Sequence, residues 1–467
     1  MSYIEIVYTI MIVLGFLSVF FPLEYAIYFI VGIFYKGKPF PEREEKLRYG
    51  VIVCARNEEK VIGNLVESIK KSDYPQEKLD IFVIAHNCTD NTAEIARQNG
   101  AIVYEYNNEN EKTKGYALKH IFECINRDYG TLNYDGFHIF DADNVLDKNY
   151  FNKMNDAFLA YDKKCAVTSF RNSKNFGANV ITACYGILYA VGCRIEACGR
   201  MALKTSARIL GSGFLVSSEM VKDGWNIVIL SDDTDFTIEQ VLKGNRVIYC
   251  NDAMYYDEHP TTIKAMWRQR LRWAKGTFIV LNKRFKSLFC YTFGRRKKGE
   301  KKRLRASSLD LLCCILPVGI IGLGILGIDL ILRSLAPLFN CDPAIVWKNW
   351  AILFGVSTAL SYLGLVLIAI ITYIIERKRI KNVSTSLKIA SVFIWPIFAT
   401  LLVFLQLTAM FKKKFAWTPI VHSNSSNYET FNSNLKDENK QIKDVEMITQ
   451  NNMDIQLEDN VQNNANN

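Results

Sequence analysis

The stretch LDIFVIAHNCTDNTAEIARQNG at residues 79–100 decides the fold. It begins as a continuous apolar run, passes through polar residues, and continues as a segment whose apolar spacing is helical. Residues 49–72 show the same order, and strand-like or helix-like runs follow at 101–106, 116–128 and 136–144. Alternating strand and helix units predict an α/β domain around a mainly parallel sheet with both faces covered.

Polar clusters follow three of the predicted strands at the point where each strand ends. They read ARNEE (55–59), AHNCTD (85–90) and DADN (141–144). Ligands bind at the carboxyl ends of strands in such sheets, so these clusters are expected to converge. None of these strand-end clusters contains GxxxxGK[ST] or GxGxxG, so carboxylates and basic groups are expected to hold the ligand.

Four apolar segments flank this predicted domain, at residues 6–34, 309–338, 350–375 and 389–411. A membrane-spanning helix needs about 20 such residues, and the first three segments qualify. Buried helices of a soluble protein are the alternative for any of these segments, but three apolar segments of this length in one chain disfavour that alternative. A cleaved signal peptide fits the first segment poorly, because the segment is long and lacks a basic leading region.

Basic residues lie beside these segments, and the chain carries a formal net charge of +10. Lys and Arg are dense at 35–48, 295–305 and 376–381, which places the central domain on the cytoplasmic side of the plasma membrane. Nucleic acid is the rival partner for the run at 295–305, but the apolar helix beside it favours lipid. Twelve cysteines without a CxxC pair favour reduced thiols over disulfides or a zinc site.

The sequence therefore predicts five parts. These are an N-terminal transmembrane helix (1–36), a cytosolic domain (48–282), a basic juxtamembrane segment (283–306), a C-terminal transmembrane region (307–422) and a disordered Asn-rich tail (423–467). The C-terminal region is expected to hold two spans and one segment broken at Pro396, which is re-entrant or interfacial.

The motif FDADN places Asp141 and Asp143 two residues apart at a strand end. Side chains alternate along a strand, so both carboxylates can face one side of the crevice. Two oxygen ligands suit Mg²⁺ or Mn²⁺, which completes its shell with water and substrate phosphate. An ordinary turn is the alternative, since Asp and Asn commonly leave strands in this way.

Three further clusters carry candidate chemistry, each with an ordinary structural alternative. MWRQRLRWAKG (266–276) can clamp a diphosphate through arginine and stack tryptophan on a sugar, or it can lie as an amphipathic helix at the membrane surface. KTKGYALK (112–119) places lysines before a helix, as a phosphate site or as solvated surface. SDDTDF (231–236) either caps a helix that ends before Gly244 or supplies reactive carboxylates.

The clusters ARNEE, VIAHNCTDNTAEIA, KGYAL, FDADN, GSGFLVS, SDDTDF and QRLRW follow one another in this order between apolar segments. In this arrangement the chain resembles the family-2 processive-type glycosyltransferases, which include the synthases of cellulose, chitin, hyaluronan and poly-N-acetylglucosamine. The resemblance runs from Val51 to Gly276, and the membrane layout extends it to His422. It implies a GT-A fold, with a mixed, mainly parallel sheet, flanking helices and transmembrane helices at both ends.

The resemblance also implies roles for individual residues. Asp143 would be the main ligand of Mg²⁺ or Mn²⁺ on the donor diphosphate, with Asp141 beside it, and Lys114 would lie near the donor. Asp233 would be the general base and Asp232 its neighbour. The match to QRLRW implies that four residues close over the diphosphate and border the acceptor: Gln269, Arg270, Arg272 and Trp273.

One position departs from the family. The family usually has Asp after the second strand, in contact with uracil, whereas this chain has His86. Glu58 and His86 are then expected at the nucleotide base, where His86 either bonds uracil or accompanies a different nucleotide.

The resemblance implies an inverting enzyme that uses a UDP-sugar. The expected reaction moves a hexose or N-acetylhexosamine to a growing β-linked polysaccharide at the membrane, with an export partner left open. The alternative is transfer of one sugar to a membrane lipid or polyprenyl-linked acceptor. A non-catalytic transport or scaffold subunit is a further alternative, which the intact Asp141, Asp143, Asp233 and Arg272 disfavour.

Overall fold

The computed structural model describes residues 2–295, 302–380 and 383–412. The chain divides into two compact units, Met1–His422 and Ser423–Asn467. The predicted disordered tail, 423–467, lies outside the described residues.

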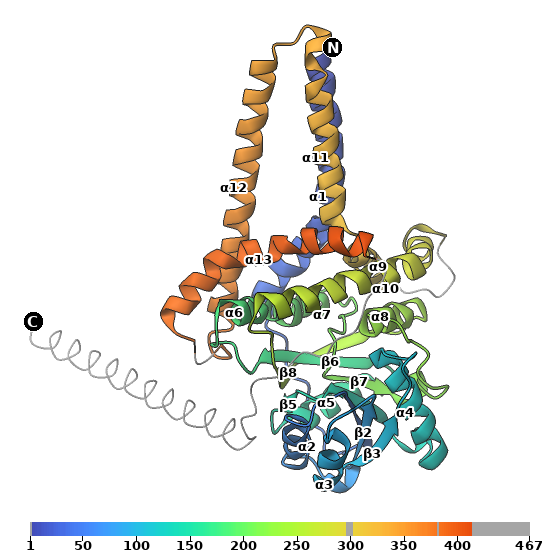
Figure 1. Cartoon of the computed structure of the whole chain (residues 1–467). Helices are drawn as coiled ribbons and strands as arrows, with labels where there is room; N and C mark the ends of the chain where they lie inside the picture. The colour runs from blue at the N-terminus through green and yellow to red at the C-terminus, as the bar shows by residue number, and fades with distance from the viewer. Residues whose placement is uncertain (1, 296–301, 381–382, 413–467) are drawn as a thin grey trace, which may run out of the picture. The chain divides into compact units, whose positions relative to one another are not determined.

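The first unit is built on one eight-stranded sheet in the order β3-β2-β1-β4-β7-β6-β8-β5 (Figure 1). The strands are β1 (Tyr49–Ala55), β2 (Leu79–His86), β3 (Ile102–Tyr106), β4 (Gly136–Asp141), β5 (Val145–Leu146), β6 (Ala166–Ser173), β7 (Phe214–Ser217) and β8 (Val247–Asp257). Strands β1 to β4 pair in parallel, as do β6 and β8, whereas β7 and β5 pair antiparallel with their neighbours. The prediction of a mixed, mainly parallel sheet is confirmed.

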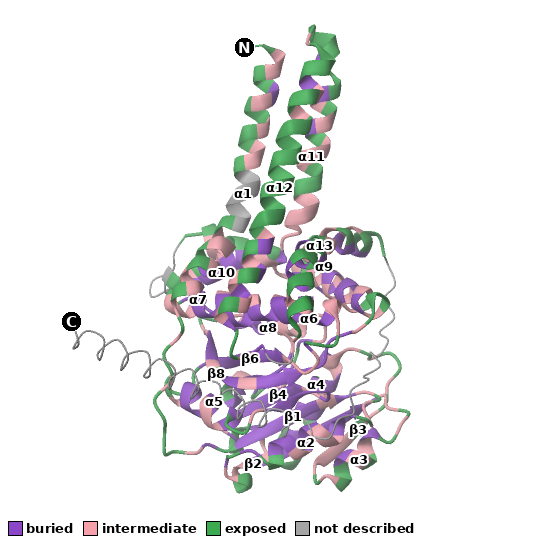
Figure 2. Ribbon diagram, turned by 90° about the vertical axis from the view of Figure 1, so that its left-hand side faces the viewer, coloured by how far each residue is buried: buried purple, intermediate pink, exposed green. Residues whose placement is uncertain are grey.

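Helices cover both faces of the sheet, because alternate side chains of each strand enter opposite cores. Val51 and Val53 of β1 pack in one core, while Ile52 packs in the other. The first core includes helices α2 (Ile62–Lys70), α3 (Thr92–Gln98) and α5 (Tyr150–Leu159), and the second includes α4 (Lys114–Asp128) and α6 (Val180–Tyr189). In Figure 2 the strands are mostly buried, apart from β3 at the edge of the sheet.

The strand directions bring polar segments to one edge of the sheet. The carboxyl ends of β1, β2, β4, β6 and β8 lie at this edge. Because β7 runs antiparallel to β4, the GSG loop at 211–213 that precedes it lies there too. The expected convergence of strand ends therefore follows from the observed topology.

An apolar stretch at Val180–Ala202 is long enough to cross a membrane but is mostly buried inside the first unit. It comprises α6, a π-helical segment at Ala190–Glu196 and α7 (Ala197–Ala202). It contacts α1 (Tyr3–Phe34), where a β-carbon on Gly199 would lie 2.0 Å from the carbonyl oxygen of Tyr28. Small residues permit this close approach of two helices.

The remaining helices include the candidate membrane spans. Helices α12 (Pro343–Ile375) and α13 (Thr385–Phe411) are long and apolar enough to cross a membrane. Helices α10 (Lys302–Ile315) and α11 (Val318–Ser334) pass the same test only as a pair bent by 63°. In Figure 1 the axes of α1, α11 and α12 are roughly aligned, and α13 crosses beneath them. Much of the surface of α12 is exposed in Figure 2.

Three sequence expectations need correction here. The span expected at 309–338 is broken at Pro317, whose missing N–H interrupts helical bonding. The segment expected to break at Pro396 is instead one continuous helix. No boundary exists at 282/283, because helix α9 (Ile263–Phe293) runs unbroken to Gly294. Within the basic run at 295–305, residues 296–301 lie outside the described residues, as does the segment 413–422.

Candidate active site

A cavity of about 920 Å³ opens at the polar edge of the sheet. All of the residues that the sequence analysis assigned to donor, metal, base or nucleotide line this one cavity: Glu58, His86, Lys114, Asp141, Asp143, Asp232, Asp233, Gln269, Arg270, Arg272 and Trp273. They come from strand ends, from the starts of α4 and α8 (Asp232–Leu242) and from α9. Segments that are far apart in the sequence are thus combined in a single site.

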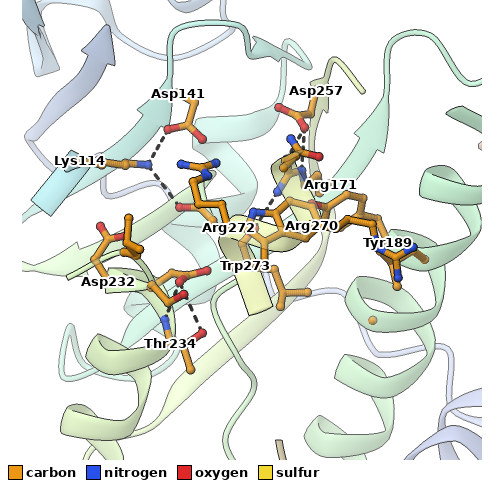
Figure 3. A pocket seen from close by; sticks show the side chains of 18 of the residues that line it. Lys114, Asp141, Arg171, Tyr189, Asp232, Thr234, Asp257, Arg270, Arg272 and Trp273 are labelled. Carbon is orange, nitrogen blue, oxygen red and sulfur yellow. Dashed lines mark hydrogen bonds and ion pairs between the residues drawn. The ribbon is translucent and has the colours of Figure 1, made fainter. Parts of the chain in front are cut away.

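One side of the cavity is built from Lys114 and the DxD motif. The Nζ of Lys114 lies 2.6 Å from Oδ1 of Asp141 and also donates to the carbonyl oxygen of Gly211 at 3.3 Å. Asp143 is nearly buried, and its Oδ1 accepts a hydrogen bond from Nδ2 of Asn144 at 3.1 Å. In Figure 3, Lys114 and Asp141 face each other, and Arg272 extends toward them from α9.

The DxD pair fits a divalent cation that is shared with a ligand. Among residues 2–295, 302–380 and 383–412, no three His, Cys, Asp or Glu side chains gather in a metal-binding group. Asp141 and Asp143 offer hard oxygen ligands, and Mg²⁺ commonly takes one or two carboxylates with water and phosphate. A cation bound here would therefore depend on phosphate oxygens from the ligand.

Asp232 and Asp233 begin helix α8 but face different neighbours. Burial raises the pKa of the Asp232 carboxyl to about 7, against the opposing charge of Lys114 and together with the like charges of Asp233 and Asp141. Burial also raises the pKa of Asp233, against hydrogen bonds from the backbone N–H groups of Thr234 and Gly211. Both carboxylates thus interact with Lys114, and Asp233 also interacts with Arg171.

Asp235, the third acid of SDDTDF, has a structural role. It is fully buried and forms ion pairs with Lys283, at 2.7 Å, and with Arg284. Both partners lie on α9, so this carboxylate ties α8 to the helix that carries QRLRW.

Asp232 makes the stability of the ligand-free protein depend on pH. Its pKa rises from the ordinary 3.8 to about 7 on folding, so its stabilising contribution is complete below about pH 4 and is lost as the pH rises to about 7. We expect the melting temperature to fall across this window and to fall less steeply in Asp232→Asn. Thermal unfolding followed by circular dichroism measures both slopes. The exposed Asp252→Asn should retain the wild-type slope, and an equal slope in Asp232→Asn would contradict the assignment.

Helix α9 presents QRLRW to the cavity. Burial lowers the pKa of the Arg272 guanidinium, whereas the charges of Asp141, Asp232 and Asp233 act to raise it. This cation therefore interacts with all three acids. The ring of Trp273 meets Tyr185 edge to face, with centroids 6.1 Å apart. In the described part of the chain, the buried Oε1 of Gln269 has no hydrogen-bond partner.

Arg270, which was expected at the diphosphate, lines the cavity but also contacts helix α13. It is buried, its Nη1 donates to the carbonyl oxygen of Phe398 at 2.7 Å, and its guanidinium lies 4.1 Å from the centroid of the Phe398 ring. These contacts commit Arg270 to α13, so it fastens the site helix to an apolar helix.

Gly276 allows α9 to approach the start of α8. A β-carbon at this position would lie 2.0 Å from Oγ and 3.0 Å from Cβ of Ser231. We expect Gly276→Ala to displace α9 from Asp232 and Asp233 and to lower kcat by roughly 10- to 100-fold, since about 1 Å of misplacement can cost that much. Steady-state rates and melting temperature should be measured together. Gly355→Ala, which meets nothing within 4 Å, is the matched control, and an unchanged kcat in Gly276→Ala would contradict the packing argument.

His86 and Glu58 line the same cavity from the ends of β2 and β1. The Nε2 of His86 is 2.7 Å from the carbonyl oxygen of Glu111, and its ring stacks on Tyr106 with centroids 5.5 Å apart. Burial lowers the pKa of His86, which favours the neutral ring. This ring edge is therefore already committed to the protein.

Sequence reasoning missed a second polar group at the ends of β6 and β8. Arg171 donates to Asp257 through Nε at 3.0 Å, and its guanidinium lies 4.1 Å from the centroid of the Tyr189 ring. Arg171, Asp257 and Glu258 line the cavity. The signal was present, because SFRNSK and YYDEH each place polar residues after a strand-like run.

The cavity also reaches the apolar helices α12 and α13. Five of their residues form this wall: Leu365, Ile368, Trp395, Ala399 and Leu402. The site thus extends from strand-end carboxylates to side chains that offer hydrocarbon surface.

Comparison with known proteins gives matches of sequence and of structure. Residues 47–276 match the model of a family described as glycosyltransferase like family 2. "Probable glycosyltransferase YdaM" of Bacillus subtilis (strain 168) is 26% identical over 241 residues, which cover 51% of this chain and 57% of that protein. Poly-beta-1,6-N-acetyl-D-glucosamine synthase of Staphylococcus aureus (strain COL) is 26% identical over 292 residues, covering 57% of this chain and 66% of that protein. The alignments therefore span less than two thirds of both relatives.

Among solved structures, the mannosyltransferase PcManGT from Pyrobaculum calidifontis, in complex with GDP-Man and Mn²⁺, has a similar fold. The TM-score is 0.54 at 17% sequence identity, and the match covers 85% of this chain and 99% of that one. At this identity the likeness concerns the fold, which is of the GT-A type.

Proposed function

Residues 47–276 form a domain of glycosyltransferase-like family 2, and on this premise we propose that the chain is an inverting, membrane-bound glycosyltransferase that uses a UDP-sugar. The sugar is a hexose or N-acetylhexosamine. The catalytic domain faces the cytoplasm at the plasma membrane, as the basic residues beside the apolar helices indicate.

The observation that carries this proposal is the presence of two groups of acids within one cavity. Asp141, Asp143 and Asp233 line it, Asp141 is paired with Lys114, and the charge of Asp233 interacts with Lys114 and Arg171. Direct displacement at an anomeric carbon needs a group that stabilises the leaving diphosphate and a base for the acceptor, on opposite sides of the reacting sugar. One side receives the departing diphosphate and the other removes a proton from the acceptor.

In the proposed reaction, the carboxylate of Asp233 accepts the proton of an acceptor hydroxyl. The hydroxyl oxygen forms a bond to the anomeric carbon as the bond from that carbon to the diphosphate breaks, and the configuration inverts. Lys114 and Arg272 stabilise the charge on the departing UDP. Asp141 and Asp143 would hold a Mg²⁺ or Mn²⁺ ion, which supplies positive charge to the diphosphate. The raised pKa of Asp233 makes it a stronger base than an ordinary carboxylate.

We propose a growing β-linked polysaccharide as the acceptor. Its support is the similarity to a poly-N-acetylglucosamine synthase and the aromatic side chains of Trp273 and Tyr189 in the cavity wall, on which sugar rings can stack. Passage of the product across the bilayer would involve a partner or a further copy of the chain.

A second candidate acceptor is a membrane lipid or polyprenyl-linked molecule that receives one sugar. The apolar wall from α12 and α13 favours it, because a hydrocarbon chain needs no hydrogen-bond partners there whereas a glycan does. Product size distinguishes the two acceptors.

The test offers the full chain in lipid nanodiscs a panel of labelled UDP-sugars with Mg²⁺ or Mn²⁺. GDP-mannose is added to the panel because His86, in place of the family's usual Asp, can accompany a nucleotide other than UDP. A polymer retained by size exclusion supports the polysaccharide, and a labelled product that extracts into organic solvent supports the lipid acceptor. Absence of transfer from every UDP-sugar, with transfer from GDP-mannose, would overturn the proposed donor.

A further inference from the structure

A half-buried lysine that the proposed reaction does not use lies behind the DxD motif. Lys174 directly follows β6, at the same sheet edge as the cavity. Its Nζ donates to the carbonyl oxygen of Asp143, and its backbone N–H donates to the carbonyl oxygen of Asp257 at 2.8 Å. The side chain therefore reaches the backbone of the candidate metal ligand.

Four carboxylates interact electrostatically with this ammonium group, and they come from the ends of three other strands. They belong to Glu58 after β1, Asp143 after β4, and Asp257 and Glu258 at the end of β8. Asp257 and Glu258 are 2% and 6% exposed, and Asp143 is 9% exposed. Little solvent is available to screen these charges.

The cluster has a specific internal arrangement. Asn144 bridges two of the acids, since its Nδ2 donates to Asp143 at 3.1 Å and to Asp257 at 2.8 Å. Arg171 donates to Asp257 through Nε at 3.0 Å. Arg171 therefore compensates Asp257, while Lys174 contacts Asp143 through the carbonyl oxygen of that residue.

A metal ion that approaches Asp143 would meet this fixed positive charge. Like charges a few ångströms apart repel strongly where solvent is scarce, so Lys174 lowers the affinity of the site for a bare divalent cation. A diphosphate brings negative charge of its own and offsets the repulsion. We propose that Lys174 is a built-in counter-charge to the acidic cluster, which makes tight metal binding depend on the nucleotide donor.

This inference rests on the proposed role of Asp143 as a metal ligand. The test measures Mn²⁺ binding to the full chain in nanodiscs by electron paramagnetic resonance, with and without UDP. Lys174→Met should tighten Mn²⁺ binding without UDP by about tenfold or more and should reduce the gain in affinity on adding UDP. Lys174→Arg, which keeps the charge, should stay within about threefold of wild type.

Two controls isolate the effect of charge. Lys164→Met removes an exposed lysine elsewhere in the domain and should leave Mn²⁺ affinity unchanged. Lys174→Gln provides a second neutral side chain if the methionine variant fails to fold. Unchanged or weaker Mn²⁺ binding in a folded neutral variant would overturn the proposal and leave Lys174 a support for the 141–144 turn. Failure of the premise is distinguishable, since Mn²⁺ binding to wild type would then be insensitive to Asp143→Ala.

Discussion

Asp233→Asn should reduce the rate of sugar transfer by about 10³-fold or more while leaving metal-dependent UDP binding within about twofold of wild type. Asparagine has nearly the same size but cannot accept the proton of the acceptor hydroxyl. Asp233 forms part of the start of α8 and accepts hydrogen bonds from the backbone of Thr234 and Gly211, while its charge also interacts with Lys114. Asparagine can accept the same backbone hydrogen bonds, so the substitution should affect the reaction step far more than the donor.

Single-turnover rates at saturating donor and calorimetric titration with UDP and Mn²⁺ measure the two effects separately. The exposed Asp252→Asn is the control for a generic loss of one negative charge. Loss of UDP binding in Asp233→Asn would place this carboxylate on the donor side and assign the base elsewhere.

Asp143→Ala should weaken metal-dependent UDP binding by about 100-fold, because one of only two candidate carboxylate ligands is removed. When a chelator removes the metal, UDP binding to the wild type should be much weaker than with the metal present. Under that condition, Asp143→Ala should change UDP affinity little. The comparison of both conditions, by calorimetric titration of the same preparations, isolates the metal-dependent part. Glu219→Ala, at an exposed position, supplies the control. Equal affinity of Asp143→Ala and wild type in Mn²⁺ would contradict the role of Asp143 as a ligand.

The strand-end rule accounts for most of what the sequence predicted about the sheet. The apolar runs before Glu58, His86 and Asp141 each became a parallel strand, and the polar residues after them line one cavity. Local sequence was sufficient there because a strand buried on both faces reads as a continuous apolar run.

The second half of the sheet was less predictable. Strand β6 contains Arg171 and Asn172, and its register with β8 shifts between Ser169 and Phe170. Polar residues within the run and a bulge both weaken the pattern that identifies a strand. The pairing of Arg171 with Asp257 joins positions 86 residues apart, which no local pattern reveals.

Arg270 shows the limit of inference by position. Within QRLRW the two arginines are equivalent to a reader of the sequence, yet Arg272 lies among the site acids whereas Arg270 is held by Phe398. The distinction depends on where α13 packs against α9, and this contact joins residues that are distant in the chain.

The anchorage of Arg270 to α13 has a practical consequence for enzymology. A helix of membrane-spanning length and composition forms part of the cavity wall and grips the helix that carries Arg272 and Trp273. Under the proposed membrane location, amphiphiles that surround the protein after extraction contact this helix directly. Turnover should therefore vary with the thickness and composition of the host bilayer, and rates obtained in micelles describe the protein together with its detergent.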